Sequence, residues 1–180
     1  LKERARKEQE RRERRERERQ QDHSDDGGSS DGGDSSGDGD SSDDGGSSGA
    51  SPMIYPVQGP ITSPYGRRFH PILHVWKLHD GTDFGVGCGT AIHAAASGRV
   101  ISRYYNEGYG NRLLVSDGQM RGVSVVTAYN HMSGYAVSTG EYVSQGEVVG
   151  YVGETGYATG CHLHFMVYEN GSTVDPMGWL

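Results

Sequence analysis

The stretch CHLHFMVYENG, residues 161–171, shows the pattern that runs through most of the chain after residue 50. Successive side chains of a β-strand point to opposite faces, so Leu163, Phe165 and Val167 would share one apolar face. His162 and His164 would share the other face. The stretch therefore predicts a strand with one face in a core and two imidazoles projecting together from the opposite face. The alternative is a half-buried strand with two incidental polar positions.

Similar short runs, broken by glycine, fill residues 51–180 and show no sustained helical period. They are TAIHAAASGRVISRYY (90–105), NRLLVSDG (111–118), GVSVVTAYNHM (122–132) and EYVSQGEVVGYVG (141–153). Residues 98–102 and 146–150 each pass from a turn glycine into a β-branched pair, which suggests a duplicated β motif. We expect one all-β domain over residues 51–180, a small and mostly antiparallel β sandwich or barrel.

The first 50 residues have a different composition. In residues 1–21, Glu precedes Lys or Arg by four positions at four places, the order that favours a helix. Because this segment lacks an apolar stripe, we expect a charged helix at the end of a coiled coil, with its partner helix upstream. Residues 22–50 are Asp, Gly and Ser apart from one His and one Ala, which predicts a flexible linker.

Charge and hydropathy exclude several classes of protein. The net charge is −7, but residues 51–180 hold seven basic and nine acidic side chains and are close to neutral. A nucleic-acid surface on this domain would need clustered Lys and Arg, and in residues 1–21 the interspersed Glu cancels much of the basic field. There is no apolar run long enough for a membrane span or a signal-peptide core. Because the chain starts at Leu1, we expect it to be part of a longer protein with its export signal upstream.

A second group of candidate residues lies in HDGTD, residues 79–83. His79 and Asp83 are four apart, and the glycines around them disfavour a helix. We interpret the stretch as a strand edge, with His79 and Asp83 on one face and Thr82 and Phe84 on the other. The alternative is an Asp that caps a turn and a His that hydrogen-bonds to it.

Together these residues suggest a metal site. A catalytic zinc takes three nitrogen or oxygen ligands and keeps a fourth position for water, and His79, Asp83 and His164 would supply such a set. His131, in YNHMS (129–133), and His162 would then lie near the open position, where groups that transfer protons are needed.

The motifs H-x-x-x-D, Y-x-H-M-S and T-G-x-H-L-H-F resemble the lysostaphin-like, or LytM-type, family of peptidoglycan zinc endopeptidases, over about residues 52–180. The resemblance implies a β domain with an active-site groove over one Zn²⁺ per chain. It implies that His79, Asp83 and His164 are the zinc ligands and that His131 and His162 are catalytic. It also implies bacterial peptidoglycan peptides as substrate and an extracellular or cell-wall location.

One residue departs from the family pattern. Met166 stands where many relatives carry an acidic residue, on the same face as His164, so a contact to this ligand would be missing or replaced. Two other functions remain open: a noncatalytic module that binds the cell wall or activates another hydrolase, and a virion-associated lysin domain.

The chain has two cysteines, Cys88 and Cys161, each beside a segment that carries metal ligands. We expect them to form a disulfide, as cysteine pairs in exported domains commonly do. The alternatives are two free thiols or a nucleophilic Cys161. The last is disfavoured because adjacent strand residues point to opposite faces, which would turn Cys161 away from His162.

Overall fold

The structure, a computed structural model, describes residues 51–70 and 74–180. The charged helix expected over residues 1–21 and the linker expected over residues 22–50 lie outside the described residues. Both stay predictions. Within the described part of the chain, no helix is long and apolar enough to cross a membrane.

The described part is almost entirely β-structure, as the alternating runs predict, and its one helical element is a short 3₁₀ helix, η1, at Pro176–Gly178. The first six strands are β1 (Ile61–Ser63), β2 (Gly66–His70), β3 (Val75–His79), β4 (Thr82–Phe84), β5 (Ala91–His93) and β6 (Gly98–Asn106). The other six are β7 (Gly110–Met120), β8 (Val123–Tyr135), β9 (Tyr142–Val143), β10 (Val148–Val152), β11 (Leu163–Glu169) and β12 (Ser172–Val174).

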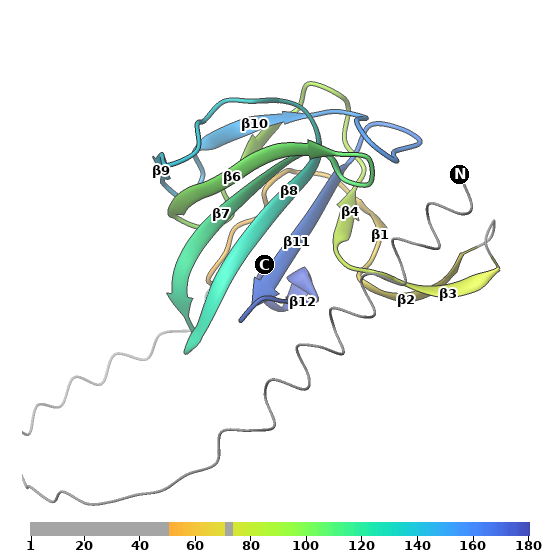
Figure 1. Cartoon of the computed structure of the whole chain (residues 1–180), viewed down its shortest axis with the longest axis horizontal. Coiled ribbons are helices and arrows are strands. Elements are labelled where there is room, and N and C mark those ends of the chain that lie inside the picture. The colour runs from red at the N-terminus through yellow and green to blue at the C-terminus, as the bar shows by residue number, and fades with distance from the viewer. Residues whose placement is uncertain (1–50, 71–73) are drawn as a thin grey trace, which may run out of the picture. The chain divides into compact units, whose positions relative to one another are not determined.

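Ten of these strands form one sheet, whose main path runs β1-β4-β11-β8-β7-β6-β9 (Figure 1). β12 pairs with β11, and β10 pairs with both β5 and the end of β8. β2 and β3 form a separate two-stranded sheet. Every strand pair in the described part is antiparallel, which confirms the expected fold class. The two segments suggested as a duplicated motif lead into β6 and β10, and the duplication itself stays a prediction.

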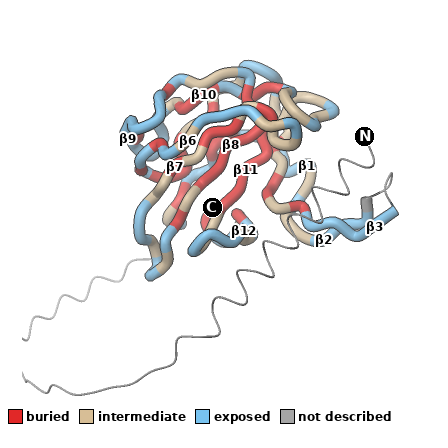
Figure 2. Tube along the Cα trace, in the orientation of Figure 1, coloured by how far each residue is buried: buried red, intermediate tan, exposed pale blue. Residues whose placement is uncertain are grey.

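The core lies along β8 and β11, the central strands of the sheet (Figure 2). Leu163, Phe165 and Val167 are completely buried, as predicted. His164 and Met166, on the opposite face of β11, are buried as well. β11 is therefore covered on both faces, and the histidine face is not an open surface.

The interpretation of residues 79–83 as a strand edge is wrong at Asp80 and Gly81, which lie in no strand, although His79 and Asp83 do face each other. β3 ends at His79 in the small sheet, and β4 begins at Thr82 in the large one. Gly81 allows this tight crossing, because a Cβ there would lie 2.5 Å from the carbonyl oxygen of Phe165 and 2.8 Å from the ring of His164. The break at Asp80 and Gly81 lets two different sheets contribute to one site.

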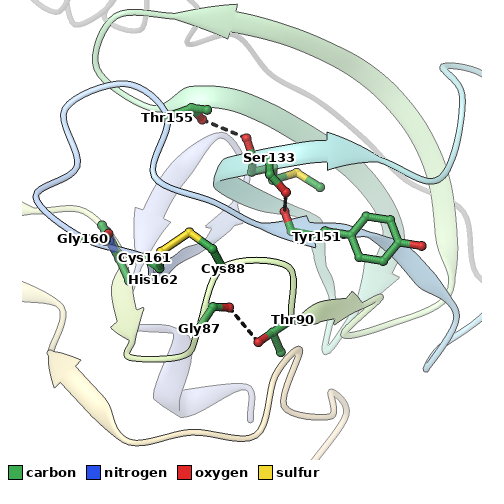
Figure 3. The surroundings of a disulfide bond; sticks show 10 residues. Gly87, Cys88, Thr90, Ser133, Tyr151, Thr155, Gly160, Cys161 and His162 are labelled. Carbon is green, nitrogen blue, oxygen red and sulfur yellow. Dashed lines mark hydrogen bonds between the residues drawn. A yellow bond between two sulfur atoms is a disulfide. The ribbon is translucent and has the colours of Figure 1, made fainter.

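The expected disulfide between Cys88 and Cys161 is present. It joins the loop after β4 to the segment that enters β11, immediately before His162 (Figure 3). The bridge closes a loop of 73 residues, and cross-links of this kind stabilise a fold by about 2–4 kcal/mol.

Candidate metal centre

Three of the predicted site residues meet at one point. The candidate ligand atoms of His79, Asp83 and His164 all lie within 4.8 Å of one another. Nε2 of His79 is 3.2 Å from one carboxylate oxygen of Asp83, and Nδ1 of His164 is 2.7 Å from the other. Two imidazole nitrogens and one carboxylate in a largely buried cluster fit the ligand preference of Zn²⁺.

The sheet positions these side chains. His164 in β11 pairs directly with Asp83 in β4, so strand register fixes their separation. His79 arrives from the end of β3, and its Nδ1–H donates to the carbonyl of Pro64 at 2.8 Å. This hydrogen bond orients the ring so that Nε2 of His79 faces Asp83.

The electrostatics of the cluster favour a cation. Burial by itself raises the pKa of Asp83, but hydrogen bonds to His164 and His79 outweigh burial and hold this pKa far below its usual value. Burial by itself lowers the pKa of His164, but its contacts with Asp80 and Asp83 raise it overall. Asp83 is therefore ionised between two imidazoles, and a bound metal would take the place of a proton on His164.

His131 reaches the site because of a β-bulge. β7 pairs Asn111 with Met132 but Leu113 with Tyr129, so two residues of β8, Asn130 and His131, oppose the single residue Arg112. His131 has a φ of 59°, a left-handed backbone that non-glycine residues adopt rarely and at a cost. Bulges near active sites re-aim side chains in this way.

The ring of His131 is oriented by the backbone. Its Nδ1–H donates to the carbonyl of Thr155 at 2.7 Å, so Nε2 carries the free lone pair. Burial lowers the pKa of His131 to about 4, and the hydrogen bond to Thr155 opposes this shift only in part. The imidazole is therefore neutral at neutral pH and able to accept a proton.

His162 lies beside His131, with their ring centres 4.7 Å apart. It precedes β11 and is held by a bridge to Gly153. Its Nδ1–H donates to the carbonyl of Gly160 at 2.9 Å, and its Nε2 is 3.9 Å from Asp83. In both His131 and His162, Nδ1 is bound to a backbone carbonyl, and Nε2 is the ring nitrogen that is left for proton transfer. All five predicted site residues converge.

An open depression adjoins the cluster and has a volume of about 220 Å³. Thr62 in β1, Asp83 in β4 and Gly85 just after β4 line it, together with Thr159–His162 before β11. Because Asp83 and His162 are among the lining residues, the depression opens onto the cluster.

Sequence reasoning missed a residue beside the metal centre. Asp80 places Oδ1 at 3.2 Å from Nε2 of His164, and its other oxygen accepts a hydrogen bond from the hydroxyl of Tyr109. In the sequence Asp80 looks like an ordinary turn residue before a glycine. The one available signal is that HDGTD contains two aspartates within four residues of a candidate ligand.

Comparison with known proteins identifies the family. Residues 77–176, more than half of the chain, match the profile of peptidase family M23. The chain belongs to this family. Its M23 relatives include the DD-carboxypeptidase/endopeptidase Mpg of Neisseria meningitidis, 38% identical over 140 residues, which are 78% of this chain and 31% of the relative. The chain thus spans less than a third of this M23 relative.

Two solved structures share the fold. A zinc-containing peptidase from Vibrio cholerae has a TM-score of 0.64 at 32% identity, covering 68% of this chain and 38% of that one. The catalytic domain of lysostaphin from Staphylococcus simulans has a TM-score of 0.58 at 32% identity, covering 66% of this chain and 90% of that one. The lysostaphin-like resemblance of the sequence motifs is confirmed.

Proposed function

We propose that this chain is a zinc-dependent endopeptidase that hydrolyses peptide stems or cross-bridges of bacterial peptidoglycan. One observation carries the proposal: a His, Asp, His ligand set and two further histidines converge beside an open depression. Family membership supports the reaction class, and the relative Mpg is described as a DD-carboxypeptidase/endopeptidase and lysostaphin as a peptidase.

In this proposal one zinc ion per chain is held by His79, Asp83 and His164. The tautomers agree with these roles, because the hydrogen bond from His79 to Pro64 leaves Nε2 free for a metal. When bound, zinc would polarise the peptide carbonyl and acidify a water molecule.

We assign proton transfer to His131 and His162. His131 is neutral, with its Nε2 lone pair free, so it accepts the proton of the attacking water at Nε2. His162 directs Nε2 into the site, 3.9 Å from the Asp83 carboxylate, where a protonated imidazole could donate. From there it can hydrogen-bond to the developing oxyanion or protonate the leaving amine.

The proposed substrate sets the location. Peptidoglycan peptides are extracytoplasmic, so we propose that the domain acts outside the cell or at the cell wall. The disulfide between Cys88 and Cys161 agrees with an oxidising compartment.

Purified peptidoglycan tests the proposal. The zinc-loaded protein should release peptides that mass analysis can assign to one cleaved bond type. Chelation should stop the release, and added zinc should restore it. An Asp83→Ala, His164→Ala double variant should neither bind zinc nor release peptides. Binding to the wall without any peptide release by the zinc-loaded native protein would instead favour a noncatalytic module.

A further inference from the structure

We propose that Asp80 is a positioning residue that fixes the tautomer and orientation of His164, so that Nδ1 of this ring is available to the metal. The inference rests on the proposed role of His164 as a ligand, and it adds a residue for which neither motif nor family comparison assigns a role.

The two ring nitrogens of His164 face different carboxylates. Nδ1 lies 2.7 Å from Asp83, inside the candidate ligand set, and Nε2 lies 3.2 Å from Asp80, outside it. An ionised carboxylate only accepts hydrogen bonds, so the nitrogen beside Asp80 has to carry the proton. By the same rule Nδ1 carries a proton beside Asp83 while no metal is bound. A bound metal would replace that proton, and Asp80 would retain the proton on Nε2, so the lone pair would be on Nδ1. Partners of this type orient metal-binding histidines and raise their basicity.

Asp80 is itself held by a network of side chains. The hydroxyl of Tyr109 donates to Asp80, and the ring of Tyr109 stacks on His164 with an interplanar angle of 25°. The guanidinium of buried Arg112 lies 4.3 Å from the centre of the Tyr109 ring. Tyr109 thus contacts both a cation and the His164 ring, and its hydroxyl is hydrogen-bonded to Asp80.

The same network accounts for Met166. Arg112 donates to the hydroxyl of Tyr168 and lies 3.6 Å from the sulfur of Met166. Position 166 therefore contacts Arg112 rather than supplying a carboxylate to His164. Asp80 supplies that carboxylate from the β3–β4 crossing instead.

Tyr109 also links this network to the other candidate catalytic group. Its backbone carbonyl accepts the N–H of His131 at 2.8 Å, at the strained position of the β8 bulge. One residue of the β6–β7 turn therefore contacts both the carboxylate that orients His164 and the backbone that aims His131.

Two readouts independent of catalysis test the proposal: the zinc dissociation constant, from chelator competition, and the protonation of the His164 nitrogens, from ¹⁵N NMR. Asp80→Asn is nearly isosteric, but its amide can turn to donate to Nε2 and so favour the wrong tautomer. We expect Asp80→Asn and Asp80→Ala to weaken zinc binding about 10- to 100-fold. In the zinc-free variants, His164 should no longer be protonated uniformly at Nε2.

Two further variants complete the test. Tyr109→Phe keeps the ring on His164 but removes the hydroxyl, so it should weaken zinc binding in the same direction and by less. Glu107→Gln is the matched control for Asp80→Asn. It also removes one negative charge, at an exposed residue of the β6–β7 turn that carries Tyr109, and it should leave zinc binding unchanged. If Asp80→Ala does not fold, the zinc affinities of Asp80→Asn and Tyr109→Phe still test the role of Asp80.

The proposal is overturned if Asp80→Asn and Tyr109→Phe both bind zinc as tightly as the native protein and keep Nε2 of His164 protonated. Failure of the proposed function would look different. In that case the native protein would not bind zinc, or His164→Ala would bind it normally.

Discussion

At the scale of single residues, the site depends on two unusual backbone positions. His131 adopts a left-handed conformation at a bulge, and Gly81 leaves room for the ring of His164. The bulge aims His131 where a regular strand would not, whereas Gly81 leaves space for His164 at its regular position in β11. Each feature has a measurable consequence.

The neutral state of His131 should appear in the pH dependence of stability. Its pKa in the folded protein is about 4, whereas an ordinary His titrates near 6.5. Between these values the unfolded chain binds a proton that the folded chain does not, so this contribution to stability is lost as pH falls from about 6.5 towards 4. The slope is at most about 1.4 kcal/mol per pH unit. Urea unfolding of the zinc-free protein should show a shallower acid loss for His131→Gln, and equal slopes would refute this assignment.

Gly81→Ala tests the close approach of His164. A Cβ at this position collides with the Phe165 carbonyl oxygen and with the His164 ring, so the substitution should cost about 1–3 kcal/mol of unfolding free energy and weaken zinc binding. Gly87→Ala is the matched control, because a Cβ there meets nothing within 4 Å. Similar zinc affinity and stability in both variants would mean that the connection between β3 and β4 tolerates a side chain at position 81.

At the scale of elements, β4, β11 and the β2–β3 hairpin bring the candidate ligands together, and the disulfide joins the two segments that flank β4 and β11. Strand pairing alone sets the register of Asp83 opposite His164. We therefore expect the bridge to contribute to stability more than to the geometry of the metal site.

Replacing both Cys88 and Cys161 by Ser should lower the unfolding free energy by about 2–4 kcal/mol, measured by urea titration without reductant. Zinc affinity should change little, because the pairing of β4 with β11 remains. Thiol counting on the unfolded native protein should find no free thiol. A large loss of zinc binding in the double variant would show that the bridge, and not the sheet, positions the ligands.

Much of this element structure follows from local pattern. Alternation along residues 161–171 predicts a strand whose Leu163, Phe165 and Val167 are buried. Alternation does not reveal what covers the other face, since Tyr109 and Arg112 belong to a distant turn and strand. The role of Asp80 cannot be predicted from the sequence for this reason. The bulge at His131 cannot be predicted either, because it arises from the register between β7 and β8.

At the scale of the whole domain, metal binding and folding should be coupled. His79 and Asp83 are four residues apart, but His164 lies 81 residues after Asp83, so the unfolded chain does not hold the three candidate ligands together.

Zinc at 100 times its dissociation constant should therefore raise the unfolding free energy by about 2.7 kcal/mol. Because contacts with Asp80 and Asp83 raise the pKa of His164, a proton competes with zinc at higher pH than at an ordinary His. The zinc-dependent increase in unfolding free energy, measured by thermal unfolding with and without chelator, should be present at neutral pH. It should become smaller as the pH is lowered. An increment that does not change on acidification would contradict the assignment of His164 as a ligand.

The most direct test of the central claim is mass spectrometry of peptides released from purified peptidoglycan in ¹⁸O-labelled water. The zinc-loaded native protein should introduce one ¹⁸O into each new carboxyl terminus. His131→Ala and His162→Ala should keep zinc yet release peptides at least about 10²- to 10⁴-fold more slowly. Near-native release by both variants, or no labelled peptide from the native protein with zinc bound, would contradict the account.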